Sequence, residues 1–119
     1  MSPTSLLAAD AAQSLVLADA ALVSPSGIVS RTLLQTPELR VVLFAFDAGQ
    51  ELTPHTSRRR ALAQVLSGAC DFFHSDAWHR LEAGALLHLP PGHLHAVRAG
   101  AGPFTLLLTL AAEPAAPSL

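Results

Sequence analysis

Hydrophobic and polar residues follow a repeating pattern over most of the chain. From Ile28 onward, short segments rich in β-branched, leucine and aromatic residues are separated by Gly, Pro, Asp and Ser. The segments have lengths typical of β-strands: Ile28–Leu34, Leu39–Phe46, Ala61–Leu66, Cys70–His74, Ala85–Leu89, His95–Arg98 and Pro103–Leu110. The residues around Ser75 predict a hairpin over Asp71–Leu81. Short strands at regular spacing predict an all-β fold, a sandwich or barrel, rather than alternating strands and helices.

The two ends of the chain lack this pattern. The sequence therefore predicts three parts, an N-terminal arm, a β-barrel and a C-terminal tail, at residues 1–26, 27–112 and 113–119. The arm is apolar, but Asp10 and Asp19 interrupt it and the first basic residue of the chain is Arg31. It resembles neither a signal peptide with a basic beginning nor a membrane span.

Composition and charge narrow the class of protein. Of 119 residues, 50% are hydrophobic and only 13% are charged, which excludes a disordered chain and fits one folded domain. The net charge of -2 provides no basic surface for nucleic acid or an anionic membrane. The single cysteine, Cys70, cannot form an internal disulfide, so a reducing cytoplasm is the expected location.

Glycine, proline and histidine recur at fixed spacings in two places. The first set is Gly49, then His55 after five residues, then Gly68; the second set is Gly84, Pro90, Gly92 and His95. The glycines are suited to turns, and the Pro-Pro-Gly corner directs the following histidine toward the barrel interior. The spacings resemble the two motifs of the cupin superfamily, whose small members are single antiparallel β-barrels of the jelly-roll type. The resemblance implies this fold for about residues 39–110.

The resemblance also implies a metal site, and the sequence departs from it. In metal-binding cupins, two histidines and a glutamate of the first motif join the histidine of the second around a divalent transition metal such as Zn, Ni, Fe or Mn. Here Ser57 and Ala61 replace the second histidine and the glutamate, which leaves His55 and His95. Two imidazoles are fewer than the three protein ligands of catalytic zinc sites. We expect an incomplete site, with His93 as a candidate third ligand.

The expected pocket lies inside the barrel and is lined by His55, Ser57, Ala61 and His95. Three arginines follow the first histidine, and guanidinium groups pair well with carboxylate or phosphate. Arg58 and Arg60 are therefore candidates for attracting an anion. The alternative is a solvated turn with one arginine in an ion pair between subunits.

Three functions remain open from the sequence. The first is binding of a small organic molecule in the barrel, with an anion as one candidate. The second is a metal-dependent enzyme of the dioxygenase or isomerase type that uses His55, His95 and a non-standard third ligand. The third is a stand-alone sensor domain, because cupin barrels resemble the ligand-reading halves of some transcription regulators. The large apolar fraction in a small domain also predicts a homodimer, with the N-terminal region as an element exchanged between subunits.

Overall fold

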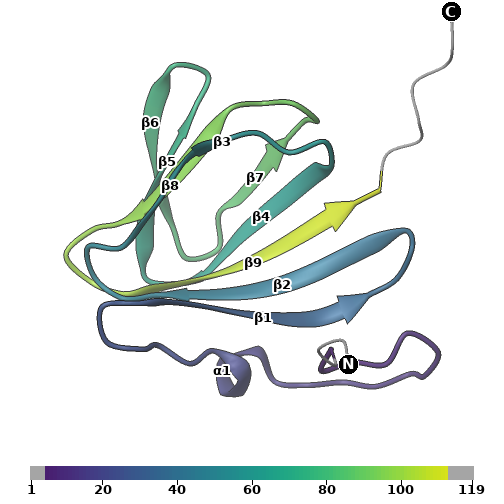
Figure 1. Ribbon diagram of the computed structural model, residues 1–119. Helices are drawn as coiled ribbons and strands as arrows, with labels where there is room; N and C mark the ends of the chain where they lie inside the picture. Colours follow the sequence, from purple (N-terminus) through teal and green to yellow (C-terminus); the bar gives the residue numbers. More distant parts are fainter. Residues whose placement is uncertain (1–4, 113–119) are drawn as a thin grey trace, which may run out of the picture.

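The computed structural model describes residues 5–112, and β-strands dominate this part of the chain (Figure 1). One short helix, α1 (Leu17–Ala20), precedes the strands. The strands are β1 (Ile28–Gln35), β2 (Leu39–Phe46), β3 (Glu51–His55), β4 (Arg60–Ser67), β5 (Ala69–His74), β6 (Ala77–Glu82), β7 (Leu86–Leu89), β8 (His95–Ala99) and β9 (Phe104–Ala111). Each segment predicted from the hydrophobic pattern is a strand whose ends differ by no more than one residue.

The strands form two sheets that face each other across the core. The larger sheet has the order β1-β2-β9-β4-β7 and the smaller one the order β3-β8-β5-β6. All neighbouring strands are antiparallel. Figure 1 shows the smaller sheet lying over the larger one. The all-β, antiparallel fold expected from the sequence is confirmed.

Side chains from both sheets meet in one hydrophobic core. On β4, Ala61, Ala63 and Val65 are buried while Gln64 faces solvent, as strand alternation requires. The rings of Phe46 and Phe104 stack where the end of β2 pairs with the start of β9, with 4.5 Å between centroids. Small residues on β4 leave space between the sheets, and this space is where the candidate site lies.

Strand β3 is the element that the hydrophobic pattern did not predict. Its sequence, ELTPH, is mostly polar and contains Pro54. Proline cannot donate a ladder hydrogen bond, but β3 is an edge strand, where proline is tolerated. The register with β8 shifts between Leu52 and His55, and this irregularity places His55 directly opposite His95.

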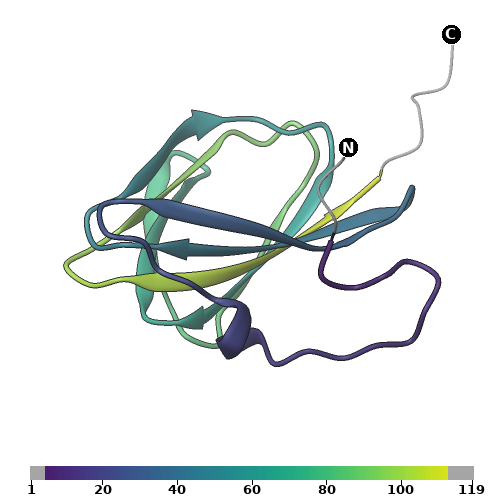
Figure 2. The same cartoon turned by 60° about the horizontal axis from the view of Figure 1, so that its bottom comes forward.

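The N-terminal arm covers part of the outer face of the larger sheet. Figure 2 shows it running beside β1, with α1 near the start of that strand. Ala20 forms a small second core with Leu33 and Leu43, and Leu15 and Leu17 pack against it. The division of the chain into arm, barrel and tail stays a prediction, as does exchange of the arm in a homodimer. The predicted tail, 113–119, lies outside the described residues.

Membrane insertion by a helix has no support in residues 5–112. No helix in this range has the length and apolar character that a membrane span requires.

Candidate functional site

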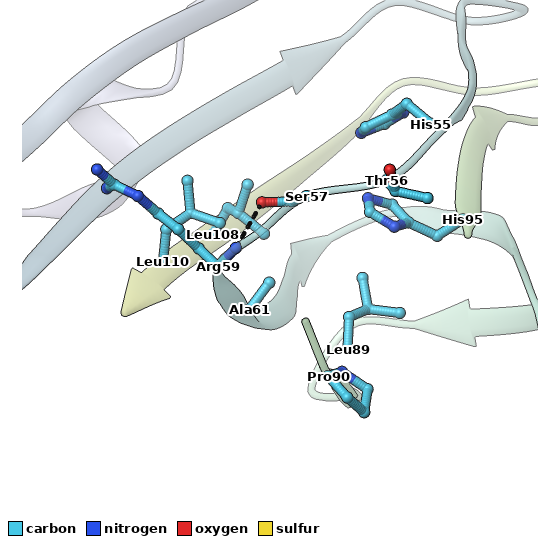
Figure 3. A pocket seen from close by; sticks show the side chains of 10 residues that line it. All are labelled: His55, Thr56, Ser57, Arg59, Ala61, Leu89, Pro90, His95, Leu108 and Leu110. Carbon is cyan, nitrogen blue, oxygen red and sulfur yellow. Dashed lines mark hydrogen bonds between the residues drawn. The ribbon is translucent and has the colours of Figure 1, made fainter. Parts of the chain in front are cut away.

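A pocket of about 300 Å³ opens between the two sheets at one end of the barrel (Figure 3). Its walls come from the connection after β3, from β4, from the end of β7, and from β8 and β9. The lining residues are His55, Thr56, Ser57, Arg59, Ala61, Leu89, Pro90, His95, Leu108 and Leu110. The four residues that the sequence assigned to a pocket all line it. None of the ten lining residues is acidic.

Strand pairing brings the two histidines together. His55 at the end of β3 and His95 at the start of β8 are register partners across the smaller sheet. Their ring centroids are 4.2 Å apart, with an angle of 62° between the rings. The two imidazoles therefore form one polar group on the pocket wall, as the two motif spacings predicted.

Backbone hydrogen bonds determine which nitrogen of each neutral imidazole carries the hydrogen. Nδ1 of His55 lies 2.8 Å from the carbonyl oxygen of Thr53, and Nδ1 of His95 lies 2.8 Å from that of His93. A carbonyl oxygen can only accept, so each Nδ1 carries the hydrogen and donates it. In a neutral imidazole the Nε2 atom is then an acceptor. Within residues 5–112, neither Nε2 has a hydrogen-bond partner.

The neutral form of His95 is favoured by its surroundings. Partial burial lowers the pKa of this imidazole, because the charged ring would lose solvation. The hydrogen bond to the carbonyl of His93 acts in the opposite direction and raises the pKa. The neighbouring His55 and His93 lower the pKa further. The net lowering means that an acceptor nitrogen, rather than a cation, faces the pocket near neutral pH.

A smaller apolar hollow adjoins the pocket on the core side of the histidines. It measures about 80 Å³ and shares His55, His95, Leu89 and Leu108 with the pocket. The rest of its wall is apolar: Phe44, Leu52, Phe72, Val97 and Leu106. The imidazoles thus lie where a wider pocket with a polar rim meets a smaller hydrophobic recess.

The pocket does not fit a metal ion. Ser57 and Ala61 occupy two of the four ligand positions of metal-binding cupins, and Ser57 Oγ accepts a hydrogen bond from the backbone N–H of Arg59. His93, the candidate third ligand, lines a different hollow, where its Nε2 lies 3.2 Å from Ser75 Oγ. In the part of the chain that the structure describes, no three His, Cys, Asp or Glu side chains are grouped so that they could hold a metal.

The arginine at the pocket is the middle one of the triplet. Arg59 is partly buried and lines the pocket, whereas Arg58 and Arg60 are exposed and do not. Arg60 Nη1 lies 2.9 Å from His88 Nε2 instead. Strand alternation gave no signal for Arg59, because this residue lies in the bend just before β4 begins at Arg60. Attraction of an anionic ligand by Arg58 and Arg60 stays a prediction.

Comparison with known proteins agrees with this fold. A protein from Streptococcus pyogenes of unknown function is 26% identical, with a TM-score of 0.79, covering 97% of this chain and all of that one. A cupin superfamily protein from Desulfitobacterium hafniense is 23% identical, with a TM-score of 0.78, covering 85% of this chain and 92% of that one. A cupin 2 conserved barrel domain protein from Leptotrichia buccalis is 29% identical, with a TM-score of 0.76, covering 80% of this chain and 46% of that one.

The family follows from a further comparison. No curated protein matches the chain. The family model of the AraC-like ligand-binding domain, however, matches residues 21–115, which is most of the chain. The cupin resemblance seen in the motif spacings is confirmed, and the chain belongs to the AraC-like ligand-binding domain family.

Proposed function

We propose that this protein binds a small organic anion in the pocket between its two sheets. The observation that carries the proposal is a partly buried arginine, Arg59, on the wall of a largely apolar pocket with no acidic lining residue. Pockets of this kind, with few polar groups on apolar walls, are typical of small-molecule sites. Membership in a family of ligand-binding domains supports the same function.

The charge arrangement favours a carboxylate over a neutral ligand. A guanidinium group donates two parallel hydrogen bonds to a carboxylate, and partial removal from water strengthens the attraction. Leu108 and Leu110 lie on β9 beside Arg59 and offer an apolar surface to the rest of the ligand. The ligand is thus held by its charge at the rim and by hydrophobic contact along the wall.

A panel of small carboxylates and their neutral amides tests the proposal by thermal shift. Carboxylates are expected to raise the melting temperature by mass action, and the amides are not. Arg59→Gln should lower carboxylate affinity by about tenfold or more, because a charged hydrogen bond is lost. Arg58→Gln is the matched control, since Arg58 is an exposed neighbour outside the pocket. A carboxylate response that is equal in both variants would contradict the proposal.

A sensor role is the second candidate function, and the family match favours it. A sensor binds its ligand without consuming it, whereas an enzyme converts it. Incubation of the protein with a bound carboxylate, followed by NMR of the small molecule, separates the two. An unchanged ligand supports the sensor, and a new product identifies an enzyme.

A further inference from the structure

We infer that the natural ligand is a hydroxy acid in which an apolar body separates a carboxylate from a hydroxyl group. The inference rests on the proposed function and names its ligand class. The carboxylate contacts Arg59, the apolar body lies along the leucines of the wall, and the hydroxyl donates its hydrogen to the His55–His95 pair.

The histidine pair sets the polarity of the group that it can bind. The Nδ1 atoms of His55 and His95 are committed to backbone carbonyls, so the Nε2 atoms offer lone pairs. A carboxylate offers only lone pairs as well, so it gains no hydrogen bond from neutral Nε2 atoms. The group at the pair must therefore be a hydrogen-bond donor, and the carboxylate must lie elsewhere in the pocket.

A hydroxyl group fits the surroundings of the pair better than an ammonium group. An ammonium ion needs an anionic partner in a partly desolvated site, and none of the lining residues is acidic. A hydroxyl group is neutral, and its oxygen also accepts hydrogen bonds. Thr56 also lines the pocket, and its hydroxyl offers a further hydrogen-bond donor to a ligand oxygen.

The two polar ends of the pocket are separate, which determines where the ligand carries its groups. Figure 3 shows the Arg59 side chain extending to the side away from the two imidazoles, with Leu108 and Ala61 between them. A single small group cannot contact both ends. A rigid body with polar groups at opposite ends, such as a para-substituted aromatic ring, matches this arrangement better than an acid whose hydroxyl is next to its carboxylate.

The hydroxyl group should contribute strongly to selectivity. A site with a buried acceptor discriminates against an analogue that lacks the donor, because the acceptor then stays desolvated without a partner. His95 is partly buried at the entrance to the apolar recess, so water replaces the missing group poorly. We expect removal of the ligand hydroxyl to lower affinity by at least about tenfold.

The test uses calorimetric titration of the purified protein with three probes of the same shape. The probes are 4-hydroxybenzoate, benzoate, which lacks the hydroxyl, and 4-hydroxybenzamide, which lacks the charge. The expected order has 4-hydroxybenzoate binding tightest, with each of the other two weaker by at least about tenfold. His95→Phe should reduce the preference for 4-hydroxybenzoate over benzoate and leave the preference over the amide intact. Arg59→Gln should do the reverse.

A second measurement does not depend on any variant. Long-range ¹H–¹⁵N NMR of the imidazoles should show an unprotonated Nε2 in His95, and 4-hydroxybenzoate should shift this signal more than benzoate does. Equal affinity for 4-hydroxybenzoate and benzoate overturns the hydroxy-acid inference and leaves the anion pocket standing. Equal affinity for 4-hydroxybenzoate and its amide overturns the proposed function. A protonated Nε2 at neutral pH also overturns the inference.

Discussion

This protein has two groups of histidines, which differ in the hydrogen bonds that their ring nitrogens make. His55 and His95 form the pocket pair, in which Nδ1 is held by the backbone and Nε2 faces a cavity. His74, His79 and His93 form the hairpin trio, located where the β5–β6 turn meets the loop before β8. The trio has more imidazoles, yet the pair is the better site. An available acceptor that faces a cavity matters more than the number of rings.

Three ring nitrogens of the trio make hydrogen bonds to the trio itself or to Ser75. The rings of His74 and His79 stack 3.9 Å apart, and Nε2 of His79 donates to the carbonyl of His74 at 3.2 Å. The hydroxyl of Ser75 lies 3.2 Å from both His74 Nδ1 and His93 Nε2. These contacts tie two loops together. They serve the local structure, and the rings of the trio do not line the pocket between the sheets.

The largest expected effect comes from restoring the replaced metal ligands beside the pair. Ser57→His together with Ala61→Glu places four ligands where cupin metal sites have them, and nickel affinity should rise by more than about a thousandfold, measured by calorimetry. Without metal, the double variant should be less stable by about 2 kcal/mol or more, because Ala61 is buried and a glutamate there is unpaired.

A matched change in the trio provides the control. Ser75→His adds a fourth imidazole to the trio, on an exposed turn residue with a φ of 52°. It should leave nickel affinity low, since stacked rings do not converge on one point. Tight nickel binding by Ser75→His, or its absence in the double variant, would reverse the ranking of the two groups.

A smaller effect is expected on stability. His95→Leu removes an Nε2 acceptor that has no partner within residues 5–112, but it also removes the hydrogen bond from Nδ1 to the His93 carbonyl. The two effects oppose each other, so the free energy of unfolding should change by no more than about 1 kcal/mol while ligand binding is lost. His79→Leu removes a stacked ring and a hydrogen bond from the trio, and it should lower that free energy while preserving ligand binding. Urea denaturation with each variant measures both. Destabilisation by His95→Leu of more than about 1 kcal/mol would show that the pocket imidazole supports the fold.

The smallest expected effect concerns pH. Partial burial lowers the pKa of His74 below its ordinary value of 6.5, and the nearby His79 and His93 lower it further. The folded protein therefore binds fewer protons than the unfolded chain. The stability associated with neutral His74 is fully present above pH 6.5, and it is lost as the pH falls toward the lowered pKa. His74→Gln should make the fall in the urea midpoint between pH 7.5 and pH 5.5 less steep. An unchanged slope would mean that the trio accepts a proton without cost.

The hydrophobic pattern predicted most of the strands, because strands that pack in the core must carry apolar side chains. The run Leu39–Phe46 is a strand with the predicted ends, and the alternation on β4 buries Ala61 and Ala63. Strand β3 did not follow because an edge strand can be polar and can hold Pro54. The arm contains one helical turn, α1, whose Ala20 packs with Leu33 and Leu43 of the larger sheet.

The pocket was predictable in part. His55 and His95 were found from motif spacing, since turns and strand register act over short distances. Arg59 was not singled out from the triplet, because it lies before β4 begins and strand alternation does not place it. The position of His93 depends on contact with Ser75, which is far away in sequence, and no local pattern reports such a contact. The nature of a site residue was therefore easier to predict than its partners.

The central place of β9 in the larger sheet has a consequence for folding during synthesis. β9 pairs with β2 on one side and with β4 on the other, so it separates strands that the ribosome makes much earlier. Until Ala111 has left the ribosome, Phe46 and Val65 have no strand between them and their apolar faces stay open to solvent. The nascent chain is expected to depend on chaperones over this interval, and a stall before Phe104 should yield an aggregation-prone intermediate rather than a half-folded barrel.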